Sequence, residues 1–134
     1  MTCHYIDNQL YLENVALSTI ADTHGTPTYV YTKAKITQNY LSYRSAFGSR
    51  AHDICYAVKA NSNIAVLHLL KQLGAGFDVV SVGELERLAA AGGELGRTVF
   101  AGVGKMRSEM ERAFALDDDC FHIASCHARG PINI

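Results

Sequence analysis

The chain has 134 residues, of which 49% are hydrophobic, and its formal net charge is -1 at pH 7. This length is sufficient for one globular, soluble domain with a sizeable core. Because the charge is near neutral and Lys and Arg form no long run, the sequence argues against nucleic acid or an anionic membrane surface as a partner. A small-molecule partner is therefore predicted.

The apolar and cysteine patterns indicate a protein of the cytoplasm. No apolar run approaches the ~20 residues of a membrane-spanning helix, and residues 1–9 lack the zones of a signal peptide. The four cysteines are irregularly spaced and include no CxxC pair, so we expect neither a disulfide framework nor a zinc ribbon. The cluster of Cys and His over residues 120–127 has the spacing of no common zinc finger, and no metal is expected.

The first 32 residues predict a short β-rich segment. Residues 5–6 and 10–12 are typical of two strands around the polar turn 7–9, which together form a candidate hairpin. A helix is expected over residues 17–23. The sequence Gly-Thr-Pro at residues 25–27 then interrupts it, because Gly and Pro break helices.

After this break the sequence predicts one more strand and a long helix. Residues 28–31, Thr-Tyr-Val-Tyr, form a short β-rich run, since Tyr and Val suit a pleated surface. A helix from Lys33 to about Phe47 then leads to the stretch ICYAVKAN, residues 54–61.

From Ile54 onward, strand-like and helix-like segments alternate. Apolar runs begin near Ile54, Phe77, Thr98 and Cys120, about 22 residues apart, and the segments between them have helical character. This spacing is typical of successive β/α units, and it predicts a parallel sheet.

The end signals of the intervening segments support helices. In the first, Ser62 or Asn63 can cap the start and Gly74 can end it; in the second, Ser81 and Glu84 have capping-box spacing. The second ends at Gly92-Gly93, and the third covers about 107–116. The predicted apolar faces are Val66, Leu69, Leu70 and Leu73 in the first, Leu85, Leu88 and Ala89 in the second, and Met110, Ala113 and Phe114 in the third.

These elements predict an α/β fold, namely a partial (β/α)8 TIM-like barrel of about four β/α units preceded by a short N-terminal β segment. We expect the β segment over residues 1–32, the incomplete barrel over 33–125 and an aberrant tail over 126–134. Because the tail is neither a good helix nor a good strand, a truncation or a shifted reading frame near Ser125 is the hypothesis for it.

Lys59 stands at the end of the predicted strand 54–61. Alternation along a strand places it on one face with Cys55 and Ala57, where the small Ala57 leaves room beside it. In a β/α barrel this is the active-site end, and a lysine desolvated there can lose its proton and attack a carbonyl to form a Schiff base. Asp78 on the next strand could partner the lysine. A structural ion pair, or a lysine whose head reaches solvent, stays an open alternative.

Three stretches, ICYAVKANSN, GAGFDVVSVGELERLAAAGG and TVFAGVGK, carry a family resemblance. In order and spacing they resemble the start of the pyridoxal-phosphate-dependent decarboxylases of basic amino acids, and most closely the diaminopimelate decarboxylases. The segment GTPTYVYTKA is similar to the same family's approach to its barrel. The resemblance covers roughly residues 4 to 123.

The resemblance implies a cofactor, a reaction and a set of site residues. Lys59 would bind pyridoxal 5'-phosphate covalently, Asp78 and Ala57 would lie at the cofactor, and Glu84 would lie near it. The reaction would be the decarboxylation of meso-diaminopimelate to L-lysine. A homodimer is implied for the whole protein, with the N-terminal β segment joining a sheet-rich domain.

The match to this family ends at Ala124, and its later cofactor-binding segments have no counterpart in the chain. The sequence is therefore interpreted as an N-terminal fragment of an enzyme that is inactive by itself. The alternative is a catalytically inactive remnant or a small domain that binds pyridoxal phosphate or associates with another subunit.

Overall fold

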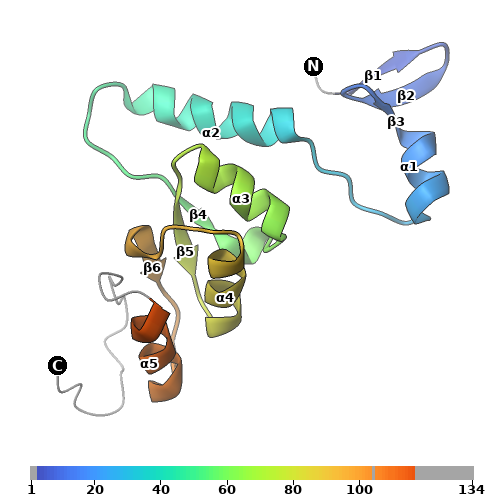
Figure 1. Ribbon diagram of the computed structural model, residues 1–134. Coiled ribbons are helices and arrows are strands. Elements are labelled where there is room, and N and C mark those ends of the chain that lie inside the picture. The colour runs from blue at the N-terminus through green and yellow to red at the C-terminus, as the bar shows by residue number, and fades with distance from the viewer. Residues whose placement is uncertain (1–2, 104, 117–134) are drawn as a thin grey trace. The chain divides into compact units, whose positions relative to one another are not determined.

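A computed structural model describes residues 3–103 and 105–116 of the chain (Figure 1). The chain divides between Ala46 and Phe47 into two compact units. The N-terminal unit contains a three-stranded antiparallel sheet, and the C-terminal unit contains a three-stranded parallel sheet. No helix within the described residues has both the length and the apolar character needed to cross a membrane.

The elements of the N-terminal unit are β1 (Cys3–Ile6), β2 (Gln9–Leu12), β3 (Val15–Ala16), α1 (Leu17–His24) and α2 (Lys33–Phe47). β1 and β2 pair antiparallel, and this pairing confirms the predicted hairpin. Between them Asp7 and Asn8 have φ angles of 46° and 66°. Two successive residues with positive φ make the tight turn that matches the twist of a hairpin, and Asp and Asn tolerate this conformation.

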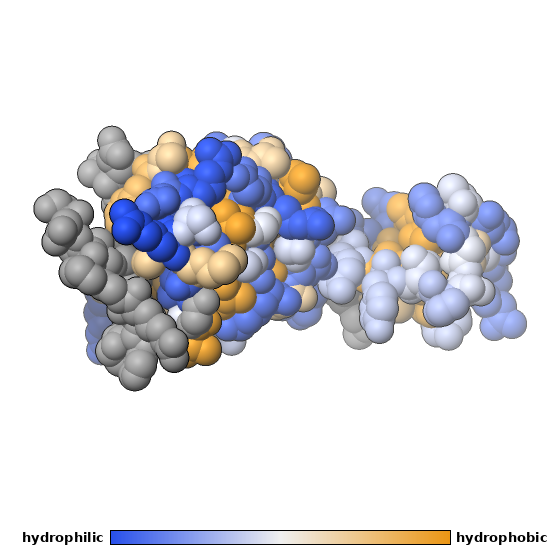
Figure 2. All heavy atoms as spheres, turned by 90° about the horizontal axis from the view of Figure 1, so that it is seen from below, coloured by the Kyte–Doolittle hydropathy of each residue, from blue (hydrophilic) through white to orange (hydrophobic). Residues whose placement is uncertain are grey.

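The predicted strand over residues 28–31 is wrong. The structure shows these residues without regular secondary structure, and the side chains of Tyr29 and Tyr31 are exposed. Tyr and Val favour strands because they pack on a pleated surface, and within the described residues no strand pairs with this segment. Hydrophobic side chains also reach the surface of the protein, as the orange spheres in Figure 2 show. Ile6 and Val15 of the small sheet are among the exposed hydrophobic residues.

The C-terminal unit consists of β4 (Cys55–Ala57), η1 (Val58–Ala60), α3 (Ile64–Gln72), β5 (Gly76–Val79), α4 (Val82–Ala90), η2 (Leu95–Arg97), β6 (Thr98–Phe100) and α5 (Arg107–Leu116), where η marks a 3-10 helix. Its strands run parallel in the order β4-β5-β6 (Figure 1). The first three predicted β/α strands are therefore confirmed. The fourth, near Cys120, lies outside the described residues.

The helix ends follow the predicted signals. At α3 the Asn63 side chain accepts a hydrogen bond from Ala65 N at 2.9 Å, and Gly74 follows with a φ of 87°. At α4 the Ser81 hydroxyl accepts from Glu84 N at 3.3 Å, and Gly92 follows with a φ of 71°. Each start is closed by a side-chain acceptor and each end by a glycine in the left-handed region.

The core lies where the helices pack on the parallel sheet. Its largest fully buried side chains are Phe77, Phe100, Leu67, Leu85, Leu88, Val58 and Val79. The predicted face of α4 is confirmed at both of its leucines. For α3 the prediction missed Leu67, which is fully buried, while Val66, Leu69 and Leu73 are half-buried. The buried face of α3 is centred on Leu67 and Leu70. The apolar residues of this helix cover more than ~100° of its circumference, so the sequence fits a face centred on Leu69 and Leu70 equally well.

The third predicted face, on α5, is confirmed in part. Ala113 is buried and Met110 is half-buried, whereas Phe114 is 37% exposed. The buried position thus holds the smallest of the three side chains, Ala113.

Candidate functional site

Lys59 lies in the turn η1, not at the end of a strand as predicted. β4 ends at Ala57, and the chain then turns so that Val58 is fully buried while Lys59 points outward. The side chain of Lys59 is 58% exposed, which agrees with the alternative of a lysine whose head reaches solvent. The buried Val58 and the exposed Lys59 thus point in opposite directions, although the strand has already ended at Ala57.

The structure brings Lys59 and Asp78 together. Lys59 Nζ lies 3.7 Å from Asp78 Oδ2, and the Asp78 side chain is 26% exposed. The second carboxylate oxygen, Oδ1, is buried and has no hydrogen-bond partner within the described residues. A buried acceptor without a donor is costly, so this oxygen marks a position where a donor from a bound group would be stabilised.

Ala57 and Asp78 are register partners in the parallel ladder between β4 and β5. Ala57 is half-buried and brings a single methyl group to the strand that neighbours the carboxylate. Both residues stand at the carboxyl ends of their strands, the edge of a parallel sheet at which binding sites form. The roles of Ala57 and Asp78 toward a cofactor remain predictions.

Glu84 lies in the first turn of α4, half-buried, and its carboxylate accepts a hydrogen bond. Glu84 Oε2 accepts from Val80 N at 2.8 Å, and Val80 is the first residue after β5. Glu84 therefore joins the helix to the end of the strand that carries Asp78. Its place near a cofactor remains a prediction from the family resemblance, whereas the capping-box spacing from Ser81 predicted only its position in the first turn of the helix.

A second lysine, Lys105, lies in the loop after β6, and the sequence did not single out its contacts. Its Nζ donates to Gly102 O at 2.7 Å and lies 5.1 Å from the centre of the Phe100 ring. The cation is thus held by its own loop and by an aromatic face. Lys105 differs in this respect from Lys59, whose neighbour is a carboxylate.

Cys55 is the first residue of β4, at the opposite end of the strand from Ala57, and the pKa of its thiol is raised. Burial raises the pKa of the Cys55 thiol, the carboxylates of Asp53 and Asp78 raise the pKa further, and the Arg97 guanidinium opposes them. Arg97 also forms an exposed ion pair with Asp53. The thiol is therefore held in its protonated form and is a poor nucleophile at neutral pH.

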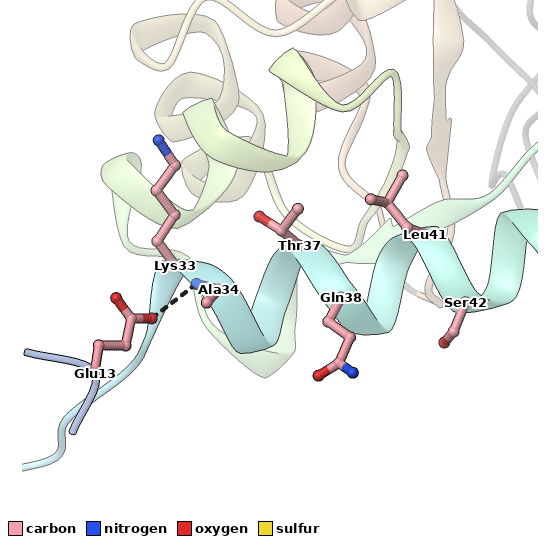
Figure 3. Close-up of a pocket in the computed structure, with 7 residues that line it drawn as sticks. All are labelled: Glu13, Lys33, Ala34, Thr37, Gln38, Leu41 and Ser42. Carbon is pink, nitrogen blue, oxygen red and sulfur yellow. Dashed lines mark hydrogen bonds between the residues drawn. The ribbon is translucent and has the colours of Figure 1, made fainter. Parts of the chain in front are cut away.

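An open groove of about 720 Å³ lies within the N-terminal unit. It is lined by Glu13, Lys33, Ala34, Thr37, Gln38, Leu41 and Ser42 (Figure 3). The Glu13 carboxylate accepts from Ala34 N at 2.9 Å and so caps the start of α2. None of the residues that line this groove belongs to the predicted site.

Comparison with known proteins gives three concordant results. Residues 33–127 match the family model described as pyridoxal-dependent decarboxylase, pyridoxal binding domain. A diaminopimelate decarboxylase of Pseudomonas aeruginosa is 52% identical over 124 residues, which are 92% of this chain and 30% of the relative. A diaminopimelate decarboxylase of Vibrio cholerae is 50% identical over 89% of this chain and 28% of the relative.

Solved structures of the same enzyme are similar to this chain. The diaminopimelate decarboxylase of Helicobacter pylori, complexed with L-lysine, has a TM-score of 0.73 at 44% identity. The matched region covers 81% of this chain and 28% of the H. pylori chain. The M. jannaschii enzyme, also in complex with L-lysine, has a TM-score of 0.79 at 29% identity. The matched region covers 90% of this chain and 29% of the M. jannaschii chain. The chain thus spans about 30% of the length of the curated relatives it matches.

Proposed function

Because the chain belongs to the family of pyridoxal-dependent decarboxylases, we propose that it supplies the cofactor-attachment part of an enzyme that converts meso-diaminopimelate to L-lysine. The family consists of lyases that use pyridoxal phosphate. The substrate is proposed from the curated relatives, which are diaminopimelate decarboxylases, and from the L-lysine in two similar structures.

One observation carries this proposal: Lys59 Nζ, in the turn that follows β4, lies 3.7 Å from Asp78 Oδ2 on the neighbouring parallel strand β5. The cofactor is an aldehyde, and a primary amine is the group that attaches it. The buried Asp78 Oδ1 has no partner within the described residues and can accept a hydrogen bond from an N–H or O–H of a bound group. The chemistry of both residues therefore fits pyridoxal phosphate.

When bound, the cofactor supplies an electron sink that stabilises the carbanion left by loss of carbon dioxide. The protein residues provide attachment, orientation and proton movement. Lys59 Nζ would attach the cofactor and could afterwards carry a proton, since its side chain is 58% exposed. Asp78 orients the ammonium of Lys59, and Ala57 keeps the neighbouring strand free of bulk.

The experiment is covalent labelling of the 134-residue chain with pyridoxal phosphate and borohydride, followed by peptide mapping. We expect the label on Lys59 and its loss in Lys59→Ala. Lys105→Ala is the matched control, because Lys105 is held by Gly102 O and the Phe100 ring and its removal leaves the labelling of Lys59 unchanged. A label spread over many lysines and unchanged in Lys59→Ala contradicts the proposal.

The second candidate is a domain that binds pyridoxal phosphate without turnover. The observation that favours it is the 58% exposure of the Lys59 side chain, because decarboxylation requires a site that excludes water. Release of carbon dioxide from meso-diaminopimelate separates the two candidates. Specific labelling of Lys59 together with no release supports binding alone.

The larger architecture is proposed from family membership. We propose that β4, β5 and β6 with α3, α4 and α5 belong to a (β/α)8 barrel, of which residues 33–125 form an incomplete part of about four β/α units, and that residues 1–32 join a sheet-rich domain. A homodimer is the proposed assembly and the cytoplasm the proposed location of the whole enzyme. Equilibrium sedimentation of the purified protein tests the assembly.

A further inference from the structure

Glu84 completes the hydrogen bonding at the end of β5. In the ladder with β4, Gly76 N donates to Ile54 O at 2.9 Å, so alternate residues of β5 direct their N–H groups toward β4. By the same alternation, the N–H groups of Asp78 and Val80 face the side of β4, as that of Gly76 does. There β4 has already ended and become η1, and the acceptor of Val80 N is Glu84 Oε2 at 2.8 Å.

The other side of the same turn is held by β6 and its loop. Ala101 N donates to Val79 O at 2.8 Å, and Gly102, with a φ of 95°, lies directly against Val80. The backbone that follows Asp78 is therefore fixed from both sides. On the side of Lys59 this is done by a single side chain, Glu84.

We propose that Glu84 is a positioning residue for the Lys59–Asp78 pair, acting through Val80 N and not through contact with a cofactor. Within the described residues the ion pair of Lys59 is with Asp78, and the bonds of Glu84 are to the turn between β5 and α4. This inference rests on the proposed function, because attachment of a cofactor to Lys59 is the reason for holding Asp78 beside this lysine.

The matched variants are available in the chain. Glu84→Ala removes the acceptor, whereas Glu84→Gln keeps an oxygen that can accept from Val80 N. The control is Glu109→Ala, because Glu109 is a carboxylate of the same kind: its Oε2 accepts from Met106 N at 2.9 Å in the first turn of α5.

The first measurement is amide hydrogen exchange. Exchange at Val80 is expected to be roughly tenfold faster in Glu84→Ala, since its hydrogen bond is lost, and within about threefold of the original in Glu84→Gln. In Glu109→Ala the faster exchange is at Met106 and Val80 is unchanged. Unchanged exchange at Val80 in Glu84→Ala overturns the proposal.

The second measurement is the rate of reductive methylation of Lys59 by formaldehyde, without pyridoxal phosphate. Asp78→Ala is expected to raise this rate by about threefold or more, because it removes the neighbouring carboxylate, whose attraction favours the charged and unreactive form of the amine. Glu84→Ala changes it in the same direction, Glu84→Gln restores it, and the double variant Asp78→Ala/Glu84→Ala matches Asp78→Ala. Independent, additive effects of the two substitutions overturn the proposal.

These measurements separate the two levels of inference. If borohydride labelling fails at Lys59 while the exchange and methylation results are as expected, the proposed function is wrong and the positioning role of Glu84 stands. If labelling of Lys59 is specific but the methylation rates are additive, the proposed function stands and the positioning role is wrong.

Discussion

Gly76 of β5 lies directly against Cys55 of β4, its register partner. A Cβ at Gly76 would come within 2.8 Å of both Cys55 Sγ and Arg97 O. The glycine is required here by the close approach of the neighbouring groups, since one of them is backbone and cannot move aside.

Gly76→Ala is therefore expected to lower the free energy of unfolding by about 1–3 kcal/mol, the usual cost of forcing an extra carbon into a packed site. Urea denaturation followed by circular dichroism measures it. Gly83→Ala is the control, because Gly83 has open space around it and lies inside α4, where alanine stabilises by roughly 0.5–1 kcal/mol. Equal effects of the two substitutions would contradict this account of β5.

Leu67→Ala is expected to lower the free energy of unfolding by about 2–5 kcal/mol, because Leu67 lies on the buried face of α3 and is fully buried. Val66→Ala, one position earlier and half-buried, is expected to cost only about 1 kcal/mol. Thermal and urea unfolding of both variants test which residue lies at the centre of the buried face. A larger loss in Val66→Ala than in Leu67→Ala is the result that would reject the packing of α3.

Removal of the Asn63 cap is expected to weaken α3. Asn63→Ala leaves Ala65 N without its side-chain acceptor and should cost about 0.5–2 kcal/mol of unfolding free energy. Ser62→Ala is the control, since Asn63 and not Ser62 is the capping residue. If Ser62→Ala were as costly as Asn63→Ala, the observed start of the helix would be in error.

The raised pKa of the Cys55 thiol leads us to expect a lower free energy of unfolding at high pH. Because burial raises its pKa above the ordinary value of 9.0, the folded protein holds this proton more tightly than the unfolded chain. The stabilisation is complete below about pH 9 and is lost as the pH rises through the folded-state pKa. Urea midpoints measured between pH 7 and 10.5 should therefore fall less steeply in Cys55→Ala than in the original chain.

The control for this thiol is Cys3→Ala, because Cys3 is also exposed but lies on β1, outside the parallel sheet. Comparison of the two variants separates the effect at Cys55 from the effect of losing any cysteine. Parallel pH curves for Cys55→Ala and the original chain count against a raised thiol pKa.

Much of the C-terminal unit could be predicted because local signals and tertiary structure agree. Asn63 and Ser81 cap, Gly74 and Gly92 terminate, and the apolar runs between these helices become parallel strands. In the N-terminal unit, the polar pair Asp7 and Asn8 adopts the positive φ angles that a hairpin needs. In each case a residue's own chemistry decides its local conformation.

Failures arose where a distant partner decides the conformation. The strand expected at residues 28–31 has β-forming side chains, but the structure describes no strand beside it. The strand expected to reach Lys59 ends at Ala57, where the chain enters the 3-10 helix η1, and strand alternation carries no signal for that change. The pairing of Lys59 with Asp78 was foreseen, whereas the bond from Val80 N to Glu84 depends on where β4 ends.

Val58 and Lys59 place a fully buried side chain directly before an exposed one. A side chain that is 0% exposed anchors the backbone from which the Lys59 side chain extends. The reach of a reactive amine is thus set by the residue that precedes it. In protein design, a β-branched anchor followed by lysine in a single 3-10 turn offers a way to present an amine at the edge of any parallel sheet, with its range of motion limited by one hydrophobic contact.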